Sequence, residues 1–171
     1  MTDPRPHDED FADFMRARWG DLVRTLVSLG CDPHEAEDVA QTALARCLRA
    51  WDRVRAADDV DAYVYRTLLN CWNKSRRRRW WGEQPTERLP EAPSAGQHDP
   101  GLDSALDRAS LIGALGRLSV DHRTVLVLRF GADLSEAQTA EVLGIAAGTV
   151  KSRVSRALAA IDHRDLSEES S

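Results

Sequence analysis

Residues 135–158 have the sequence SEAQTAEVLGIAAGTVKSRVSRAL. Ser135 and Gln138 have the spacing of a capping box, which predicts the start of a short helix, and Gly144 predicts the turn that ends it. A longer and more basic helix is then expected from about Ala147. A short helix, a tight turn and a longer basic helix are typical of a helix-turn-helix, whose second helix enters the major groove of DNA.

The phase of the second helix determines which side chains face outward. Its apolar positions form one stripe, which consists of Val150, Val154, Ala157, Leu158 and Ile161. The rest of the circumference carries Thr149, Lys151, Ser152, Arg153, Ser155 and Arg156. Residues 147–161 contain three basic side chains and no acidic one, which suits contact with phosphates and base edges. A helix that only packs its stripe on a core is the alternative, but it does not account for the missing acids.

The flanking sequence divides into two helical segments. Residues 82–101, GEQPTERLPEAPSAGQHDPG, contain four of the seven prolines and almost no large apolar residue, which predicts a flexible linker. The segments on either side have apolar residues at three- and four-residue steps. We therefore predict an all-α fold of two small helical domains, 8–81 and 102–165, with the helix-turn-helix in the second. Within the second domain, helices are expected over 102–118 and, after a serine cap, over 119–131. We expect the two domains to move independently unless a partner clamps them.

Helix ends in the first domain can be placed from local chemistry. An apolar stripe from Phe11 to Val27 stops at Gly30. Asp32 and Glu35 then have the spacing of a capping box, which predicts a second helix. Its buried stripe is expected to consist of Ala36, Val39, Ala40, Ala43, Leu44, Cys47, Leu48 and Trp51.

A third helix is expected from about residue 61, after a polar loop over 52–60. Its inward residues are expected to be Tyr65, Leu68, Leu69 and Trp72. Residues 70–81 at its end contain one lysine, four consecutive arginines and three tryptophans, with no acid. Cations that hold a backbone beside aromatic rings that stack on bases are expected where single-stranded nucleic acid is bound. A basic helix end that interacts with the helix dipole is the simpler alternative.

The composition excludes several classes of protein. The 171 residues carry 23 Lys+Arg and 28 Asp+Glu, and this net charge of −5 excludes a uniformly basic nucleic-acid coat protein. No apolar run approaches the ~20 residues of a membrane span, and the start lacks a signal peptide's apolar core, so we expect a cytoplasmic protein with no membrane contact. Cys31, Cys47 and Cys71 match neither a disulfide framework nor a zinc site. Phosphate-loop, GxSxG and HExxH motifs are missing. We therefore expect no enzyme activity, no cofactor and no metal, with Cys47 and Cys71 as buried thiols.

Three stretches resemble one protein family. Residues 32–51, DPHEAEDVAQTALARCLRAW, resemble region 2.2 of extracytoplasmic-function (ECF) RNA polymerase sigma factors, and residues 61–79, DAYVYRTLLNCWNKSRRRR, resemble their region 2.4. Residues 115–158 resemble region 4. The acidic N-terminus and the WDRVR sequence at Trp51 favour the actinobacterial, SigE-like branch. The order and spacing of the three stretches are more specific than a lone helix-turn-helix.

The resemblance implies a sigma factor that binds core RNA polymerase and directs promoter recognition and transcription initiation. Region 4 would contact the minus-thirty-five element, and region 2 would hold the minus-ten element, with 52–60 as the loop around an extruded base. By position, the minus-thirty-five residues are Thr149, Lys151, Ser152, Arg153 and Arg156. The minus-ten residues are Asn70, Asn73, Lys74, Arg76 and Arg77, and the polymerase-binding residues are Glu37, Asp38, Gln41 and Leu44. The implied partners are core RNA polymerase and promoter DNA, and an anti-sigma factor is a further candidate partner.

Two positions depart from the family pattern. Ala146 and Ala147 stand where members often have serine, so a capping contribution of about 1 kcal/mol is missing at the recognition helix. Tyr63 stands where many members have tryptophan.

From the residues alone, two other functions stay open. One is a stand-alone regulator that binds duplex DNA without polymerase, and the other is a protein that sequesters a transcription factor and tolerates the loss of Arg153 and Arg156.

Overall fold

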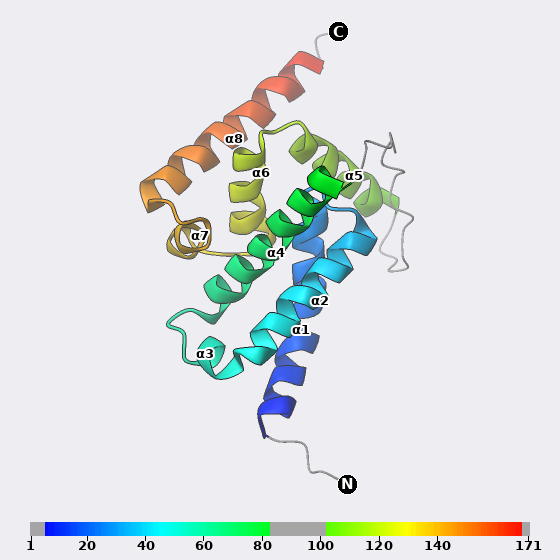
Figure 1. Cartoon of the computed structure of the whole chain (residues 1–171). Coiled ribbons are helices and arrows are strands. Elements are labelled where there is room, and N and C mark those ends of the chain that lie inside the picture. Colours follow the sequence, from blue (N-terminus) through cyan, green and yellow to red (C-terminus); the bar gives the residue numbers. More distant parts are fainter. Residues whose placement is uncertain (1–5, 83–101, 169–171) are drawn as a thin grey trace.

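The computed structural model describes residues 6–82 and 102–168, so most of the predicted linker lies outside the described residues. Within these two ranges the regular elements are all helices (Figure 1), which confirms the all-α prediction. The first range contains α1 (Pro6–Ser28), α2 (Pro33–Arg49), α3 (Trp51–Arg55) and α4 (Val60–Gly82). The second contains α5 (Leu102–Gly116), α6 (Val120–Leu126), the π-helical turn η1 (Val127–Gly131), α7 (Glu136–Leu143) and α8 (Ala147–Glu168). None of the described helices is long and apolar enough to cross a membrane.

The predicted helix ends are largely confirmed. The Ser135 hydroxyl accepts from the Gln138 amide at 3.1 Å, and the Gln138 side-chain oxygen accepts from the Ser135 amide at 2.7 Å, which completes the capping box. Gly144 ends α7 with a φ of 66°, in the left-handed region that glycine enters at little cost. Asp32 caps α2 through the amides of His34 and Glu35. The second half of the box predicted there was wrong, because the Glu35 carboxylate binds α4 instead.

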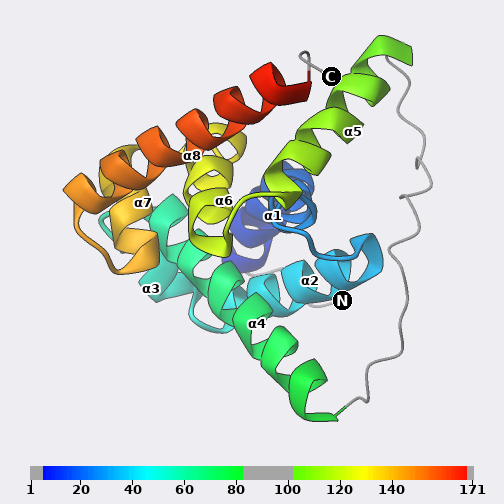
Figure 2. The ribbon, with the colours of Figure 1, turned by 90° about the horizontal axis from the view of Figure 1, so that it is seen from above.

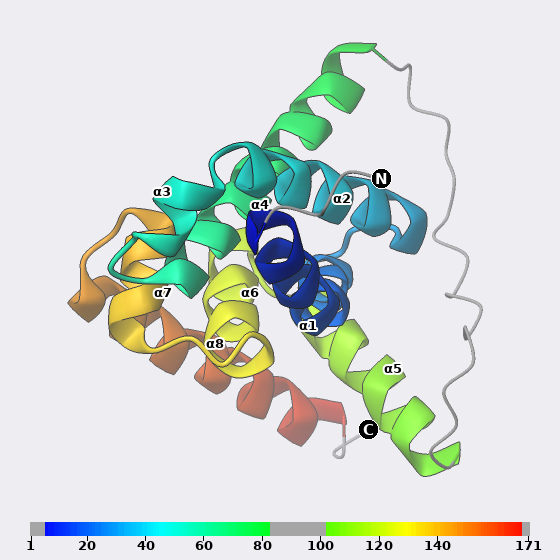
Figure 3. The same cartoon turned by 90° about the horizontal axis from the view of Figure 1, so that it is seen from below.

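The N-terminal half is built around α2, which packs against both α1 and α4. Seen from below (Figure 3), α1 lies near the centre of the whole assembly. The predicted inward residues of α4, Tyr65, Leu68, Leu69 and Trp72, are all buried. At the other end of the core, the Trp51 ring lies 5.2 Å from Phe11 and 5.1 Å from Phe14, between ring centroids. Leu48, predicted to be inside, is 44% exposed.

The stretch predicted as a loop over 52–60 is partly helical. Trp51 and Val54 are both buried, and the Val54 amide bonds to the Ala50 carbonyl at 2.9 Å, so the short helix α3 forms before the chain turns. Two apolar anchors three residues apart favour one helical turn even though the intervening residues are polar. The remaining loop covers residues 56–59 and ends where Asp59 caps α4 through the amide of Ala62 at 2.9 Å.

The C-terminal half forms the predicted helix-turn-helix. α8 packs on α6 and α7, and the predicted inward residues Val150 and Ala157 are fully buried, whereas Leu158 is exposed. The helix that begins after Ser119 ends at Gly131, as predicted, but its last turn is the π-helix η1. Leu115, Leu118, Val125 and Leu128 are buried and pack the core.

The two halves lie against each other, although independent domains were expected. α7 packs on α4, and η1 packs on α1 (Figure 2), so a single apolar cluster includes residues from both halves. Arg123 on α6 donates to the Leu115, Gly116 and Leu118 carbonyls of its own half and to the Leu29 carbonyl, at 3.1 Å, of the other. No local signal in the sequence predicted this contact.

Candidate nucleic-acid interface

The recognition helix α8 presents most of the predicted residues to solvent. Lys151 and Arg156 are exposed, and Thr149 and Ser152 are half-buried. Arg153 is more restricted, because its guanidinium lies 3.2 Å from the Asp121 carboxylate of α6 and its side chain is 27% exposed. Residues 147–161 themselves contain no acid, but the fold places Asp121 of α6 beside them. Part of the Arg153 guanidinium is therefore already engaged by Asp121 in this structure.

The second cationic surface is the C-terminal half of α4. Its five predicted minus-ten residues, Asn70, Asn73, Lys74, Arg76 and Arg77, are all exposed. Trp72 is buried, and the Arg76 guanidinium lies 5.0 Å from its ring centroid. Trp80 and Trp81 are each 87% exposed. These two rings, which no protein core requires, lie beside the cations and are free to stack on unpaired bases.

Arg79 has a different role from the rest of the arginine run. Its guanidinium lies 2.9 Å from one oxygen of Glu35, and the Ser75 hydroxyl donates to the other oxygen at 2.8 Å. The Glu35 side chain is only 10% exposed, so this cluster joins the start of α2 to the cationic part of α4. Arg79 therefore helps to join α4 to α2, in addition to being a surface cation.

Two of the four predicted polymerase-binding residues line an apolar groove. Glu37, Asp38 and Gln41 are exposed on α2, whereas Leu44 is buried. Gln41 and Leu44 line a groove of about 600 Å³ between α1 and α2, whose other walls are Phe11, Met15, Arg16, Trp19, Ala45 and Leu48. Several of these apolar residues were expected in the core. The apolar stripes of α1 and α2 are wider than one buried face requires, and this width was the signal in the sequence that could have indicated the groove.

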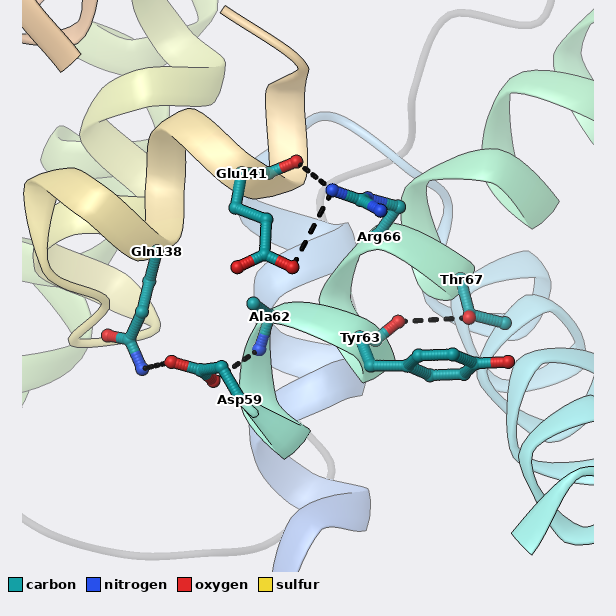
Figure 4. A network of polar contacts seen from close by, with 7 residues as sticks. All are labelled: Asp59, Ala62, Tyr63, Arg66, Thr67, Gln138 and Glu141. Atoms are coloured by element: carbon teal, nitrogen blue, oxygen red, sulfur yellow. Dashed lines mark hydrogen bonds and ion pairs between the residues drawn. The ribbon is translucent and has the colours of Figure 1, made fainter. Parts of the chain in front are cut away.

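The helix-turn-helix contacts the loop that precedes α4 at Asp59 and contacts α4 itself at Arg66. The side-chain nitrogen of Gln138 donates to Asp59 at 2.8 Å, and the Arg66 guanidinium donates to the Glu141 carbonyl at 2.5 Å (Figure 4). Tyr63, which replaces the tryptophan of many family members, is half-buried beside the core. Sequence reasoning did not identify Asp59, Arg66, Gln138 or Glu141, because each pair is more than 70 residues apart.

The three cysteines are buried free thiols, as predicted for Cys47 and Cys71. Burial raises the pKa of Cys47 to about 11. Burial, followed by the negative charge of Glu35, raises the pKa of Cys31 to about 12. Among the described residues, no cluster of three or more His, Cys, Asp or Glu side chains could hold a metal ion.

The comparisons with known proteins identify the family. Residues 15–82 match the family profile described as Sigma-70 region 2, and residues 108–161 match Sigma-70, region 4. The RNA polymerase sigma-E factor of Streptomyces coelicolor is 39% identical over 150 residues, which cover 88% of this chain and 82% of that protein. The ECF RNA polymerase sigma factor SigL of Mycobacterium tuberculosis is 34% identical over 148 residues, covering 82% of this chain and 80% of that protein.

Among solved structures, the sigma factor RpoE of Bartonella quintana, in complex with the anti-sigma factor NepR, is similar with a TM-score of 0.75 and 27% identity. The match covers 91% of this chain and 96% of that one. CnrH, in complex with the cytosolic domain of CnrY, shares the fold with a TM-score of 0.65. Two family profiles, in the order region 2 and then region 4, account for most of the described residues. The chain therefore belongs to the sigma-70 family of RNA polymerase promoter-recognition factors, in the SigE-like branch of the ECF sigma factors.

Proposed function

We propose that this sigma factor recognises its promoter with two surfaces: the exposed face of α8 on the minus-thirty-five duplex, and the cationic end of α4 on the minus-ten strand. In this proposal residues 8–81 act as region 2 and residues 102–165 act as region 4, joined by 82–101. The observation that supports the proposal is that both α4 and α8 expose cations, whereas α4 alone also exposes two tryptophans, Trp80 and Trp81. A duplex-binding helix needs no exposed tryptophans, whereas a single-strand surface uses them.

On α8, the proposed contacts divide into two kinds. Lys151 and Arg156 are exposed cations suited to phosphates, and Thr149, Ser152 and Arg153 lie closer to the body of the domain. The Asp121 side chain is 67% exposed, so water screens its ion pair with Arg153, and DNA phosphates or a base edge can replace it at low cost.

On α4, Asn70, Asn73, Lys74, Arg76 and Arg77 are proposed to hold the minus-ten strand, and residues 52–60 are proposed to hold an extruded base. Extrusion costs a few kcal/mol of stacking, which contacts in a pocket must offset. Stacking on Trp80 and Trp81 would contribute about 1–3 kcal/mol per base.

Core polymerase is proposed to bind along α2, at Glu37, Asp38, Gln41 and Leu44. The two acids suit a basic partner surface, and the apolar groove beside Leu44 offers a site for a large side chain. An anti-sigma factor is proposed as a further partner, because the similar sigma factor RpoE is in complex with one. We place this activity in the cytoplasm, where polymerase meets the chromosome.

Transcription with purified core polymerase tests the proposal. The wild-type protein should give specific initiation at a promoter selected from random DNA, and the double variant Arg153→Ala/Arg156→Ala should lose it. Arg24→Ala is the matched control, since it removes an exposed cation that pairs with Asp21 on α1, away from both surfaces. Failure of the wild-type protein to bind core polymerase, or full activity of the double variant, would overturn the proposal.

A further inference from the structure

We propose that the cleft between α2 and α4 is a phosphate-binding site, in which Arg46 and Lys74 hold one phosphate group from opposite walls. The cleft has a volume of about 370 Å³ and lies between α2 and the C-terminal half of α4, two helices that run side by side (Figure 2). Four cations and three acids are among the residues that line it. The distribution of partners among these charged groups decides what the cleft can bind.

Two of the three acids in the cleft already have partners. The Asp32 carboxylate accepts from two backbone amides at the start of α2, at 3.0 and 3.3 Å, and so caps that helix. The Glu35 carboxylate is bound by the Ser75 hydroxyl and by the Arg79 guanidinium. Among the described residues of the cleft, Asp38 is the one acid with neither a capping role nor an ion pair. Little negative charge is therefore left to balance the other cations.

Three of the four cations have no acidic partner within the part of the chain that the structure describes. Arg46 comes from α2, whereas Lys74 and Arg78 come from α4. Lys74 and Arg78 are four residues apart, so they are neighbours on one face of α4. All three side chains are exposed to solvent. Like charges that line one cleft repel one another, and a bound anion would relieve this repulsion.

The Cys71 thiol, which also lines the cleft, shows that two of these cations converge. Burial raises the pKa of Cys71, and the positive charges of Arg46 and then Lys74 act in the opposite direction. Electrostatic effects of this kind fall off with distance, so both cations lie near this one thiol although they belong to different helices. The Arg46 guanidinium can form two parallel hydrogen bonds with phosphate oxygens, and the Lys74 ammonium adds a point charge. The two side chains are therefore suited to hold one phosphate between them.

A backbone phosphate of single-stranded DNA and a free polyphosphate share this chemistry, and the neighbouring residues favour the strand. Lys74 is one of the proposed minus-ten residues, and Asn70 and Arg77 lie about one turn before and after it on the same exposed helix. A strand that lies along these residues passes the cleft. Phosphate contacts carry no sequence information but fix the position of the strand. In this respect the inference rests on the proposed function, and it adds Arg46 of α2 to the surface that holds the strand.

The test uses the full chain without polymerase and two probes, a mixed-sequence single strand of about 12 nucleotides and inorganic tripolyphosphate. Arg46→Ala removes the cation that α2 contributes, and Arg46→Lys keeps the charge but loses the two parallel hydrogen bonds. Arg24→Ala is the matched control, since it removes an exposed cation of α1 outside the cleft. Arg46 is exposed and has no ion pair among the described residues, so thermal unfolding of Arg46→Ala should match that of the wild-type protein.

We expect Arg46→Ala to weaken single-strand binding by about fivefold or more, Arg46→Lys to recover part of this loss, and Arg24→Ala to leave binding unchanged. The slope of the logarithm of the affinity against the logarithm of the salt concentration should become shallower by about 0.7, the value for one phosphate of a single strand. Arg46→Ala/Lys74→Ala should change the slope by the same amount, because both cations hold one phosphate. A change of about 1.4 would indicate two separate phosphates and would overturn the shared site.

The two probes identify the source of the phosphate. Weaker binding of the strand by Arg46→Ala supports a backbone phosphate, and weaker binding of tripolyphosphate alone supports the same site with a free polyphosphate as its ligand. Unchanged binding of both probes by Arg46→Ala would overturn the site, as would a wild-type protein that binds neither probe at about 50 mM salt. Failure of the wild-type protein to support transcription with core polymerase would instead contradict the proposed function, and it would leave the comparison of the two probes intact.

Discussion

Replacing Glu35 with glutamine should loosen the joint between α2 and the cationic end of α4. The Glu35 side chain is 10% exposed, and its carboxylate lies 2.8 Å from the Ser75 hydroxyl and 2.9 Å from the Arg79 guanidinium. A hydrogen bond to a charged group contributes about 1.5–3 kcal/mol, of which the neutral amide retains about half. Arg79 is 57% exposed, so water screens its share of the interaction to below about 1 kcal/mol.

Together these contributions predict that Glu35→Gln lowers the free energy of unfolding by about 1–2 kcal/mol. The midpoint of thermal unfolding should fall by roughly 2–8 °C, since 1 kcal/mol corresponds to about 2–4 °C in a chain of this length. Urea unfolding followed by circular dichroism measures the change, and an unaltered slope with denaturant would show that the unfolded state is unaffected. Glu37→Gln is the matched control, because Glu37 is exposed on the same helix.

The Cys31 thiol gives an independent reading of the same variant. The negative charge of Glu35 contributes to the raised pKa of Cys31, after burial, so the pKa should fall when that charge is removed. Cys31 should then react faster with iodoacetamide at roughly pH 9. Two results together would refute this account of the Glu35 cluster. The free energies of unfolding of Glu35→Gln and Glu37→Gln would agree within about 0.3 kcal/mol, the scale of a surface change, and the reactivity of the Cys31 thiol would be unchanged.

Three further predictions concern other parts of the molecule. Gly144→Ala should lower the free energy of unfolding by about 1 kcal/mol, because a Cβ there meets no neighbouring atom but is strained by the left-handed φ of 66°. Gly148→Ala on α8 is the unstrained control, and thermal unfolding measures both variants. The contribution of the Cys47 and Cys31 thiols to the free energy of unfolding should be constant below about pH 9 and fall above it. The pKa values of Cys47 and Cys31 are raised from 9.0 to about 11 and about 12, so each thiol releases a proton on unfolding in this range, with a slope of up to about 1.4 kcal/mol per pH unit. Urea titrations across this range check the fall, and a flat profile would contradict it. Finally, Trp80→Ala/Trp81→Ala should leave unfolding within about 0.5 kcal/mol of wild type, since both rings are exposed, yet weaken single-strand binding by at least tenfold; equal binding would show that the rings do not stack on bases.

The sequence by itself determined the helices and most of their ends. Ser135, Gly144 and Asp32 act within three residues of their own position, so their effects can be read from spacing alone. The positive charge of α4 and α8 could also be predicted from the sequence, because counting charges on a helix requires no knowledge of its neighbours. The same local reading misjudged Glu35, which has the right spacing for a capping box but a stronger partner on α4.

Only the tertiary structure decided which of these groups meet. The pairing of Arg153 with Asp121 and the apolar groove beside Leu48 depend on how helices far apart in the chain lie against one another. The same holds for the contact of Gln138 with Asp59. A stripe of apolar residues specifies that a helix face is covered, but it does not specify by what. Hydrophobic burial is non-directional, so the choice of neighbour emerges from packing of the whole chain and cannot be assigned to any single segment.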